Sequence, residues 1–340
     1  MLSIVIPTYN RATYLNILLK DLFYEIGSIS NNIEIKVIVI DNCSNDETIQ
    51  VIKEWQNVTP SLELIRNNAN LGIEGNLILG SICSQSEYIW MLSDHQRLRK
   101  GVVFELIELL DSDKPDLVVM DIEQWPSIYF NYNTKSRMIN NISKEELGEI
   151  LWLSGNVSTN LFKTSIAKAT ARESVRISYS FYPNMAKFSI LDREMLISRI
   201  KNATSFPNGS SAFVLKRNYD TFSASFKEHI LITKKIVSNN RELRWSIEGF
   251  QNVYYRKALV LELLKIFIIK QVSFFKTMKA LIEAFRANVS HFFPGRTALI
   301  LFLAILIMCI PFKLRRFLCM LTIKKFSSNS NLISLFEKIS

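Results

Sequence analysis

Cysteine, glycine and long apolar runs are all scarce in this chain of 340 residues. The four cysteines are widely separated, so neither a disulfide framework nor a cysteine zinc site is expected. They are Cys43, Cys83, Cys309 and Cys319. The uncharged apolar run at 297–312 has 16 residues, fewer than the roughly 20 that a straight transmembrane helix needs. A processive synthase with several membrane spans is therefore disfavoured.

The beginning of the chain lacks two further features. The turn PTYNRATY (7–14) contains no glycine. A sugar-nucleotide nucleotidyltransferase would need a glycine-rich phosphate loop at this place, so that class of enzyme is disfavoured. Met1 is followed directly by a strand pattern, without the charged and apolar segments of a secretory signal. We therefore expect the N-terminus to lie in the cytosol.

The net charge of +10 is unevenly distributed along the chain. Residues 1–226 contain 22 Lys and Arg against 25 Asp and Glu, whereas residues 227–340 contain 19 against 6. The basic part also holds the apolar run, and basic charge beside apolar surface is typical of binding to an anionic membrane. A nucleic-acid partner is not expected, because the basic part shows no folded groove with stacking aromatic residues.

Strand and helix patterns alternate in the first half of the chain. Strands are predicted at 2–7, 33–41, 62–67, 88–94 and 116–122, with helical stretches at 10–26, 72–84 and 101–111. The segment 42–55 opens a further helix, which its Asn, Ser or Asp residues can cap. This alternation predicts an α/β fold with a mostly parallel sheet covered by helices on both faces, and a ligand site beyond the carboxyl ends of the strands.

Polar clusters follow three of the predicted strands. They are 8–11 after the first strand, 41–42 after the second and 94–95 after the fourth. Because the carboxyl ends of parallel strands lie at one edge of a sheet, we expect these clusters to meet in one crevice.

Four motifs in this order resemble the nucleotide-sugar half of glycosyltransferase family 2. They are IVIPTYNRATYL, VIVIDNCSNDET, NNANLGIEGNLILG and YIWMLSDHQ, within a resemblance that covers roughly residues 1–200. The resemblance implies a Rossmann-like GT-A fold and transfer of a sugar from a nucleotide diphosphate to a hydroxyl, with inversion at the anomeric carbon. We therefore expect a catalytic domain at 1–225 and a basic, amphipathic helical region at 226–340.

The resemblance assigns binding of the donor nucleotide to ten residues. They are Pro7, Thr8, Tyr9, Asn10, Arg11, Asp41, Asn70, Gly72, Asn76 and Asp94. Each has a simpler alternative: Asp41 could cap a helix, Arg11 could be solvated, and Asn70 to Asn76 could form a loop-to-helix cap.

The segment SDHQ (93–96) departs from the family, which has two or three aspartates here that bind the ribose and a divalent cation. Asp94 is kept, and His95 and Gln96 follow. A cation held by Asp94 and His95 is the first hypothesis, and the imidazole favours Mn²⁺ over Mg²⁺. A metal-independent site, in which His95, Arg97 or Arg99 meets the diphosphate, is the second hypothesis. Loss of activity is the third.

The acceptor region and the general base are less clear. The segment LWLSGNVSTNLFKTS (151–165) resembles the family's acceptor segment and includes Ser154, Gly155 and Asn156. Where the family has an acidic pair, this chain has Pro183 and Asn184, and an amide is no proton acceptor. Candidate bases are Asp121, at a predicted strand end, and Asp192 as its alternative, with Glu123 and Glu194 also nearby.

The C-terminal region suggests where the acceptor lies. Residues 258–289 have the charge spacing of an amphipathic helix, and the apolar run follows. We expect residues 258–323 to hold the enzyme at the cytoplasmic face of the inner or plasma membrane, peripherally or as a re-entrant segment. The expected acceptor is a polyprenyl-linked saccharide for a bacterial surface polysaccharide or O-antigen. The alternative is an inactive nucleotide-sugar-binding or scaffold protein of the same fold.

Overall fold

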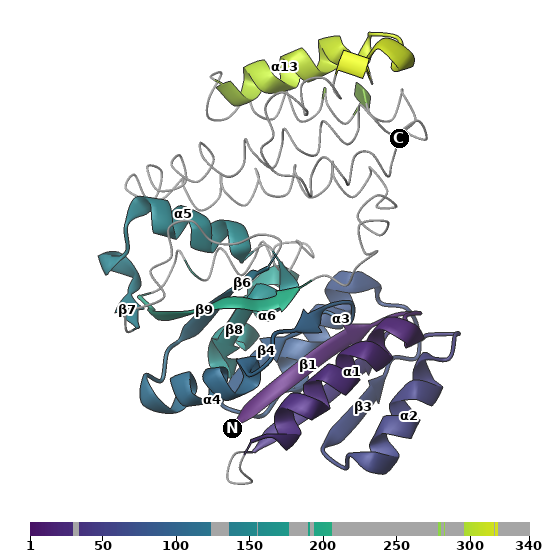
Figure 1. Cartoon of the computed structure of the whole chain (residues 1–340), viewed down its shortest axis with the longest axis vertical. Coiled ribbons are helices and arrows are strands. Elements are labelled where there is room, and N and C mark those ends of the chain that lie inside the picture. The colour runs from purple at the N-terminus through teal and green to yellow at the C-terminus, as the bar shows by residue number, and fades with distance from the viewer. Residues whose placement is uncertain are drawn as a thin grey trace. The chain divides into compact units, whose positions relative to one another are not determined.

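The computed structural model describes residues 1–29, 34–123, 136–154, 156–176, 190, 194–205, 278–279, 282, 296–315 and 317–318. The chain divides into two compact units, Met1–Asn208 and Gly209–Ser340 (Figure 1). The predicted domain boundary after residue 225 lies outside the described residues and stays a prediction.

The first unit is a nine-stranded sheet with helices on both faces. Its strands are β1 (Leu2–Thr8), β2 (Ile35–Asp41), β3 (Leu62–Arg66), β4 (Tyr88–Met91), β5 (Arg97–Leu98), β6 (Leu117–Ile122), β7 (Arg137–Met138), β8 (Asn160–Lys163) and β9 (Leu196–Ser205). Its helices are α1 (Ala12–Gly27), α2 (Thr48–Val58), α3 (Gly72–Cys83), α4 (Val102–Ser112), α5 (Lys144–Leu153) and α6 (Thr164–Arg176), with short 3₁₀ turns η1 (Ile139–Asn141) and η2 (Val157–Thr159).

The strand order is β3-β2-β1-β4-β8-β6-β9-β5, with β7 paired to β9. Strands β1 to β4 pair in parallel, as do β6 and β9, whereas β8 runs antiparallel between β4 and β6. The predicted α/β fold with a mostly parallel sheet is confirmed, and all five predicted strands occur at their expected places.

Three predictions need correction. Strands β5, β7, β8 and β9 were not predicted, although β8 separates two of the predicted strands in the sheet. The helix expected at 10–26 begins at Ala12, because Asn10 has a positive φ of 51° and Arg11 a non-helical φ of −141°. The strand expected at 88–94 ends at Met91, so the SDHQ segment forms a turn rather than a strand end.

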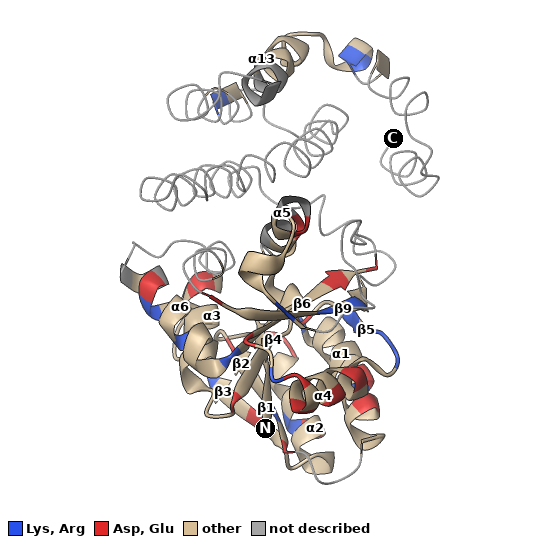
Figure 2. Cartoon of the chain, turned by 90° about the vertical axis from the view of Figure 1, so that its left-hand side faces the viewer, with Lys and Arg blue, Asp and Glu red and all other residues tan. Residues whose placement is uncertain are grey.

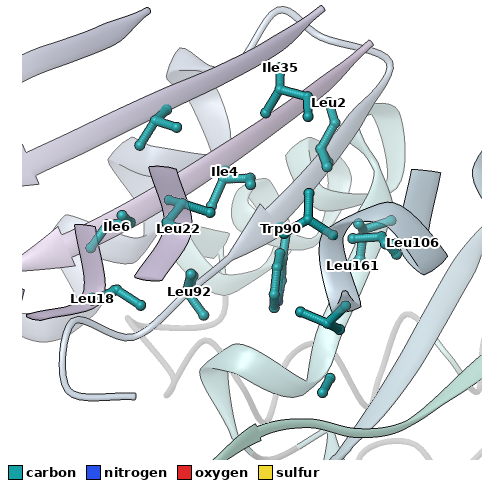
Figure 3. Close-up of a cluster of buried hydrophobic side chains, with 14 of the residues drawn as sticks. Leu2, Ile4, Ile6, Leu18, Leu22, Ile35, Trp90, Leu92, Leu106 and Leu161 are labelled. Carbon is teal, nitrogen blue, oxygen red and sulfur yellow. The ribbon is translucent and has the colours of Figure 1, made fainter. Parts of the chain in front are cut away.

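The core explains why β1 is mostly apolar. Leu2, Ile4 and Ile6 lie in one buried cluster with the apolar face of α1 and with Trp90 (Figure 3). Val5 faces the other way, towards Gly80 of α3, where a Cβ would come within 2.8 Å of Val5 Cγ1. A strand covered on both faces is expected to be almost continuously apolar.

Trp90 ties the sheet core to the segment before β8. Its ring is fully buried, and its Nε1 donates a 2.9 Å hydrogen bond to the backbone oxygen of Ser158. Burial removes the large apolar surface of the indole from water, and the hydrogen bond pairs the only donor of the ring. The segment 154–159 is thereby attached to β4, the strand that carries Asp94 just beyond its end.

In the second unit, α13 (Arg296–Met308) carries no acidic residue (Figure 2). Ala304 and Met308 are buried, whereas Phe302, Leu303 and Leu306 are exposed. None of the helices in the described part of the chain is long and apolar enough to cross a membrane.

Candidate active site

The carboxyl ends of four neighbouring strands bring polar side chains to one edge of the sheet. Thr8 of β1 pairs in register with Asp41 of β2, and Asp41 pairs with Arg66 of β3. Asp94 lies three residues beyond the end of β4, which is the other neighbour of β1. The expectation that these clusters gather at one edge of the sheet is borne out by direct contacts.

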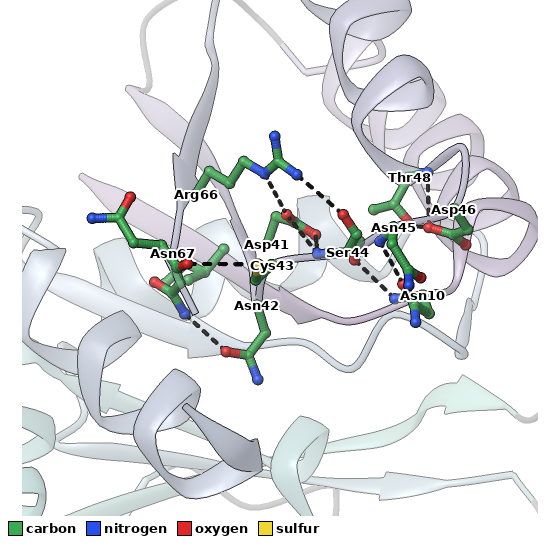
Figure 4. A network of polar contacts seen from close by, with 12 residues as sticks. Asn10, Asp41, Asn42, Cys43, Ser44, Asn45, Asp46, Thr48, Arg66 and Asn67 are labelled. Atoms are coloured by element: carbon green, nitrogen blue, oxygen red, sulfur yellow. Dashed lines mark hydrogen bonds and ion pairs between the residues drawn. The ribbon is translucent and has the colours of Figure 1, made fainter. Parts of the chain in front are cut away.

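Asp41 is the centre of the first group of contacts (Figure 4). Its carboxylate is fully buried, accepts hydrogen bonds from the backbone N–H of Ser44 at 3.1 and 3.3 Å, and forms an ion pair with Nε of Arg66 at 3.3 Å. Ser44 in turn accepts a 2.8 Å hydrogen bond from the backbone N–H of Asn10. Asp41 therefore joins β1, β2 and β3 at this edge.

Asp41 does not cap the following helix, which was the simpler alternative. Helix α2 begins at Thr48, and the backbone N–H of Thr48 donates to Asp46 at 3.0 Å. Asp46 also accepts a 3.1 Å hydrogen bond from the backbone N–H of Ala12, at the start of α1. Burial raises the pKa of Asp46, but these hydrogen bonds lower it, and the net shift is downward. Asp46 thus accepts hydrogen bonds at the starts of both α1 and α2. The contacts of Asp41 lie instead at the carboxyl ends of the strands.

An asparagine network shapes the loop between β3 and α3. Asn42 accepts hydrogen bonds from Nδ2 of Asn67 at 3.0 Å and from the backbone N–H of Leu71 at 2.9 Å. Its own Nδ2 donates to Oδ1 of Asn70 at 2.8 Å and to the carbonyl of Gly72 at 3.1 Å. The loop is therefore fastened to the end of β2 by side-chain amides.

The same network reaches the first turn of α3. Asn67 donates to Oδ1 of Asn76 at 3.0 Å, and Asn76 donates to the carbonyl of Ile40 at 3.0 Å. Gly72 has a φ of +72°, a conformation that favours glycine. Asn70 and Asn76, predicted to bind the donor, thus have their amides engaged in holding the loop, in line with the capping alternative. Asn67 was not predicted, although it directly precedes the motif.

The SDHQ turn forms the second group of contacts. Thr8 donates from its hydroxyl to Oδ2 of Asp94 at 2.8 Å, and Nη1 of Arg11 lies 3.2 Å from Oδ1 of Asp94. The same Nη1 atom lies 3.2 Å from Nδ1 of His95, and the Ser93 hydroxyl lies 2.8 Å from Nδ1. Arg11 is therefore paired with Asp94 rather than simply solvated.

Asp94 and His95 are spaced to share one cation. Oδ1 of Asp94 and Nδ1 of His95 are 3.5 Å apart. Two ligands that are each about 2.1 Å from one ion lie roughly 3.0 to 3.5 Å apart in octahedral or tetrahedral geometry. No group of three or more His, Cys, Asp or Glu side chains converges among the described residues. Two protein ligands are enough for an ion that takes its other ligands from phosphate and water. The residues therefore fit a cation bound together with a diphosphate.

The predicted acceptor segment lies beside this turn. Ser158 accepts a 2.9 Å hydrogen bond at its hydroxyl from the backbone N–H of Ser93, which directly precedes Asp94. Asn156 caps η2 by accepting from the backbone N–H of Ser158 at 3.0 Å, and Ser154 is fully buried. The structure thus brings 154–158 to the SDHQ turn, a neighbour that the sequence did not indicate. Gly155 and Asn184 lie outside the described residues.

Asp121 lies in β6 and is fully buried. Its Oδ1 accepts a hydrogen bond from the backbone N–H of Asn202, beside an irregularity in the pairing of β6 with β9. At least one role of this carboxylate is therefore to hold the two strands where their register shifts. Its assignment as general base stays a prediction. The alternative base, Asp192, lies outside the described residues.

The remaining predicted donor residues lie at the same edge. Pro7 is the last but one residue of β1 and pairs in register with Ile40. Tyr9 follows the strand and is 42% exposed. Asn10 accepts a 2.9 Å hydrogen bond at its Oδ1 from the backbone N–H of Asn45. These residues connect the first two motifs directly.

A Rossmann-like sheet with carboxylates and amides at the ends of β1, β2 and β4 defines the class of nucleotide-binding α/β enzymes. The sequence profile described as Glycosyl transferase family 2 matches residues 3–174, which is half of the chain. The chain belongs to this family. The family and fold predicted from the four motifs are confirmed.

Each of the curated relatives matches less than half of the chain. Abequosyltransferase RfbV of Salmonella typhimurium is 32% identical over 127 residues, which are 36% of this chain and 35% of that protein. The poly(ribitol-phosphate) beta-N-acetylglucosaminyltransferase TarS of Staphylococcus aureus is 23% identical over 124 residues, covering 36% of this chain and 21% of TarS. The chain thus spans about a third of the length of RfbV and about a fifth of that of TarS.

Solved structures show the same fold over a larger part of the chain. The crystal structure of S. aureus TarS 1-349 in complex with UDP has a TM-score of 0.59 and 13% sequence identity, covering 95% of this chain and 90% of that one. The complex of the same fragment with UDP-GlcNAc has a TM-score of 0.55 and 13% identity, with coverage of 84% and 81%. At this identity the likeness shows the GT-A fold alone.

Proposed function

We propose that this glycosyltransferase moves a sugar, with inversion, from a nucleotide-diphosphate donor to a hydroxyl of a saccharide acceptor in bacterial surface polysaccharide or O-antigen assembly. The observation that carries the proposal is the joining of three donor motifs at one sheet edge, through Thr8 to Asp94 and through Asn10 to Ser44, next to the buried Asp41. The complexes of TarS with UDP and UDP-GlcNAc support a nucleotide-sugar donor.

The residues of this edge suit the two ends of such a donor. Asp41 is a buried carboxylate held by two N–H contacts and by Arg66, so it can accept from a polar N–H or O–H of the nucleoside. Asp94, Arg11 and His95 form the polar group next to the proposed acceptor segment, and the Arg11 guanidinium suits the diphosphate. In this orientation the reacting carbon, at the far end of the diphosphate, would lie towards residues 154–158.

Asp94 and His95 would hold a divalent cation through Oδ1 and Nδ1. When bound, such an ion neutralises charge that builds up on the leaving diphosphate. The carboxylate and imidazole pair favours Mn²⁺ over Mg²⁺, since Mg²⁺ prefers oxygen ligands. The general base that takes the proton of the acceptor hydroxyl remains assigned to Asp121, with Asp192 as the alternative.

A panel of nucleotide sugars, measured by thermal unfolding, tests the donor. A ligand that binds only the folded state raises its stability by RT ln(1 + [L]/Kd), so we expect one nucleotide class to raise Tm. In the presence of Mn²⁺, Asp94→Asn should weaken that nucleotide at least about tenfold, because a proposed ligand of the cation that neutralises the diphosphate is lost. Asp111→Asn, at an exposed position on α4, is the control. If no nucleotide raises Tm, the proposal is wrong.

The acceptor is proposed to be lipid-linked, with a polyprenyl carrier at the cytoplasmic face of the inner or plasma membrane. Support comes from the second unit, in which Phe302, Leu303 and Leu306 are exposed on α13 and Lys313 is exposed just after it. Apolar side chains beside basic ones suit an anionic lipid surface. The relatives RfbV and TarS are named for transfer of abequose and for a poly(ribitol-phosphate) acceptor, both consistent with surface polymers.

Flotation of the full chain with vesicles tests this placement. The full chain should float with vesicles that contain about 30% phosphatidylglycerol and should dissociate at high salt, because the attraction to anionic lipid is screened. Phe302→Ser with Leu306→Ser should lower the bound fraction several-fold. Val58→Ser with Phe104→Ser removes exposed apolar side chains from the first unit and is the matched control. An equal fall in the vesicle-bound fraction of the two double variants would contradict a role for α13 in membrane binding.

A further inference from the structure

Arg11 contacts the same two atoms that would ligate the cation. Its Nη1 lies 3.2 Å from Oδ1 of Asp94 and 3.2 Å from Nδ1 of His95. A guanidinium can only donate hydrogen bonds, so Nδ1 of His95 must accept and the ring carries its hydrogen on Nε2. The lone pair that a metal would need at Nδ1 is therefore approached by Arg11 at 3.2 Å and by the Ser93 hydroxyl at 2.8 Å.

The position of Arg11 is set by its backbone. Its N–H donates to the hydroxyl of Thr48 at 3.2 Å, and its carbonyl accepts from the N–H of Leu15 at 2.9 Å in the first turn of α1. The side chain of Arg11 is 25% exposed, and that of Asp94 is 6% exposed. The ion pair is thus partly buried and screened only weakly by salt.

The other two arginines near the turn are engaged elsewhere. Arg97 forms an ion pair with Asp21 of α1, and Arg99 forms one with Glu105 of α4. The metal-independent alternative gave the diphosphate to His95 or to one of these two arginines. Among the arginines of this region, Arg11 is the one whose guanidinium contacts Asp94 and His95.

We infer that Arg11 and the divalent cation compete for Asp94 and His95, so that the cation is taken up together with the donor diphosphate and not before it. A guanidinium and a dication repel each other at this distance, so both cannot hold the same two atoms. The diphosphate resolves the conflict, since its oxygens accept from Arg11 when the side chain leaves Asp94. The inference rests on the proposed donor but not on turnover.

Competition of this kind makes the two ligands cooperative. Binding of the diphosphate draws Arg11 away and opens the cation site, and binding of the cation does the same for the diphosphate. Thermodynamic linkage requires each ligand to raise the affinity of the other by the same factor. In a variant without the Arg11 guanidinium, the cation should bind in the absence of the diphosphate. Each ligand should then raise the affinity of the other by a smaller factor.

Titration of the full chain with Mn²⁺ alone, followed by electron paramagnetic resonance of the free ion, tests the inference. Arg11→Met keeps the aliphatic length and removes the guanidinium, so Mn²⁺ should bind this variant at least about tenfold more tightly than wild type, in keeping with loss of a charge-assisted competitor. Arg97→Met removes one positive charge two residues from His95 while leaving Arg11 in place, and should change Mn²⁺ affinity less than about twofold, as expected for an exposed pair.

Repeating the titration with the nucleotide identified by thermal unfolding completes the test. Nucleotide should tighten Mn²⁺ binding at least about tenfold in wild type and less than about threefold in Arg11→Met. Equal Mn²⁺ affinity in wild type and Arg11→Met would overturn the inference. An equal rise in Mn²⁺ affinity in Arg11→Met and Arg97→Met would overturn it as well. Absence of any nucleotide binding to wild type would instead refute the proposed function, so the two failures can be told apart.

Discussion

The hydroxyl of Thr8, at the end of β1, donates a 2.8 Å hydrogen bond to Oδ2 of Asp94, 86 residues further along the chain. Asp94 is held from both sides, since its Oδ1 faces Arg11. The carboxylate is therefore oriented before any ligand binds. Pre-oriented charged groups lose little freedom when a ligand binds, which favours affinity.

Thr8→Val should therefore weaken nucleotide binding about tenfold, because a nearly buried carboxylate oxygen loses its donor. Thr8→Ser keeps the hydroxyl and should stay within about threefold of wild type. Calorimetric titration with the nucleotide measures both variants. If Thr8→Val binds as tightly as Thr8→Ser, the hydroxyl does not orient Asp94.

Asn76→Ala should lower the free energy of unfolding by about 1–3 kcal/mol. The substitution leaves the carbonyl of Ile40 without its side-chain donor and removes one acceptor of Asn67. Asn45→Ala, at an exposed position near the same edge, should cost less than about 0.5 kcal/mol. Urea unfolding of the two variants gives the comparison, and equal costs would show that the asparagine network does not hold the loop.

Gly80→Ala should destabilise the first unit by about 1–3 kcal/mol, the usual cost of overpacking. A Cβ at this position would lie 2.8 Å from Cγ1 of Val5 and 2.9 Å from Cε of Met91. Gly27→Ala is the control, since a Cβ there meets nothing within 4 Å. Denaturant midpoints measure the difference. If Gly80→Ala leaves the denaturant midpoint unchanged, α3 can move away from the sheet without a loss of stability.

Tyr88 should make stability fall between about pH 10 and pH 12. Burial, then the charges of Glu87 and Asp116, raise its pKa to about 12, and its hydroxyl has no hydrogen-bond partner among the described residues. The unfolded chain releases this proton near pH 10 while the folded chain keeps it, so folding loses free energy as pH rises through this window.

Tyr88→Phe should remove that part of the pH dependence. At pH 8 the variant should be at least as stable as wild type, because it loses a buried hydroxyl that has no partner. Unfolding by urea at pH 9, 10 and 11 measures the difference between the two proteins. A difference that stays constant across these pH values would rule out the raised pKa.

Glu146→Gln should lower stability by about 3–5 kcal/mol, because Arg199, whose side chain is 2% exposed, would keep its charge in a buried place. Glu146 of α5 contacts Arg137 of β7 and Arg199 of β9, each at 2.5 Å, and its side chain is 4% exposed. Glu194→Gln at an exposed position is the control. Thermal unfolding compares them, and a similar Tm for both would show that α5 is held by its apolar contacts alone.

The parallel part of the sheet could be predicted from the sequence because its signals are local. Strands β1 and β2 are short β-branched runs, and each is followed by a polar turn and an amphipathic helix. Parallel strands connected in this way end at one edge, so Thr8, Asp41 and Asp94 could be assigned to one site without knowing any contact.

Strand β8 could not be predicted because its place depends on partners far away in sequence. Its four residues, Asn160–Lys163, pair with β4 on one side and β6 on the other. The same holds for the contacts of Asp94: the residue type indicated a ligand site, but the pairing with Arg11 arises only when α1 begins two residues later than its apolar pattern suggests.

The direction of β8 limits how the acceptor segment can change. Because β8 runs antiparallel to β4, its first residues lie at the edge where Asp94 is found, and residues 154–159 lead straight into it. Inserting a single residue into β8 would turn its remaining side chains to the opposite face of the sheet. In the proposed acceptor segment, exchange of side chains at constant length should therefore preserve the pairing of β8 with β4, whereas an insertion into β8 should disrupt it.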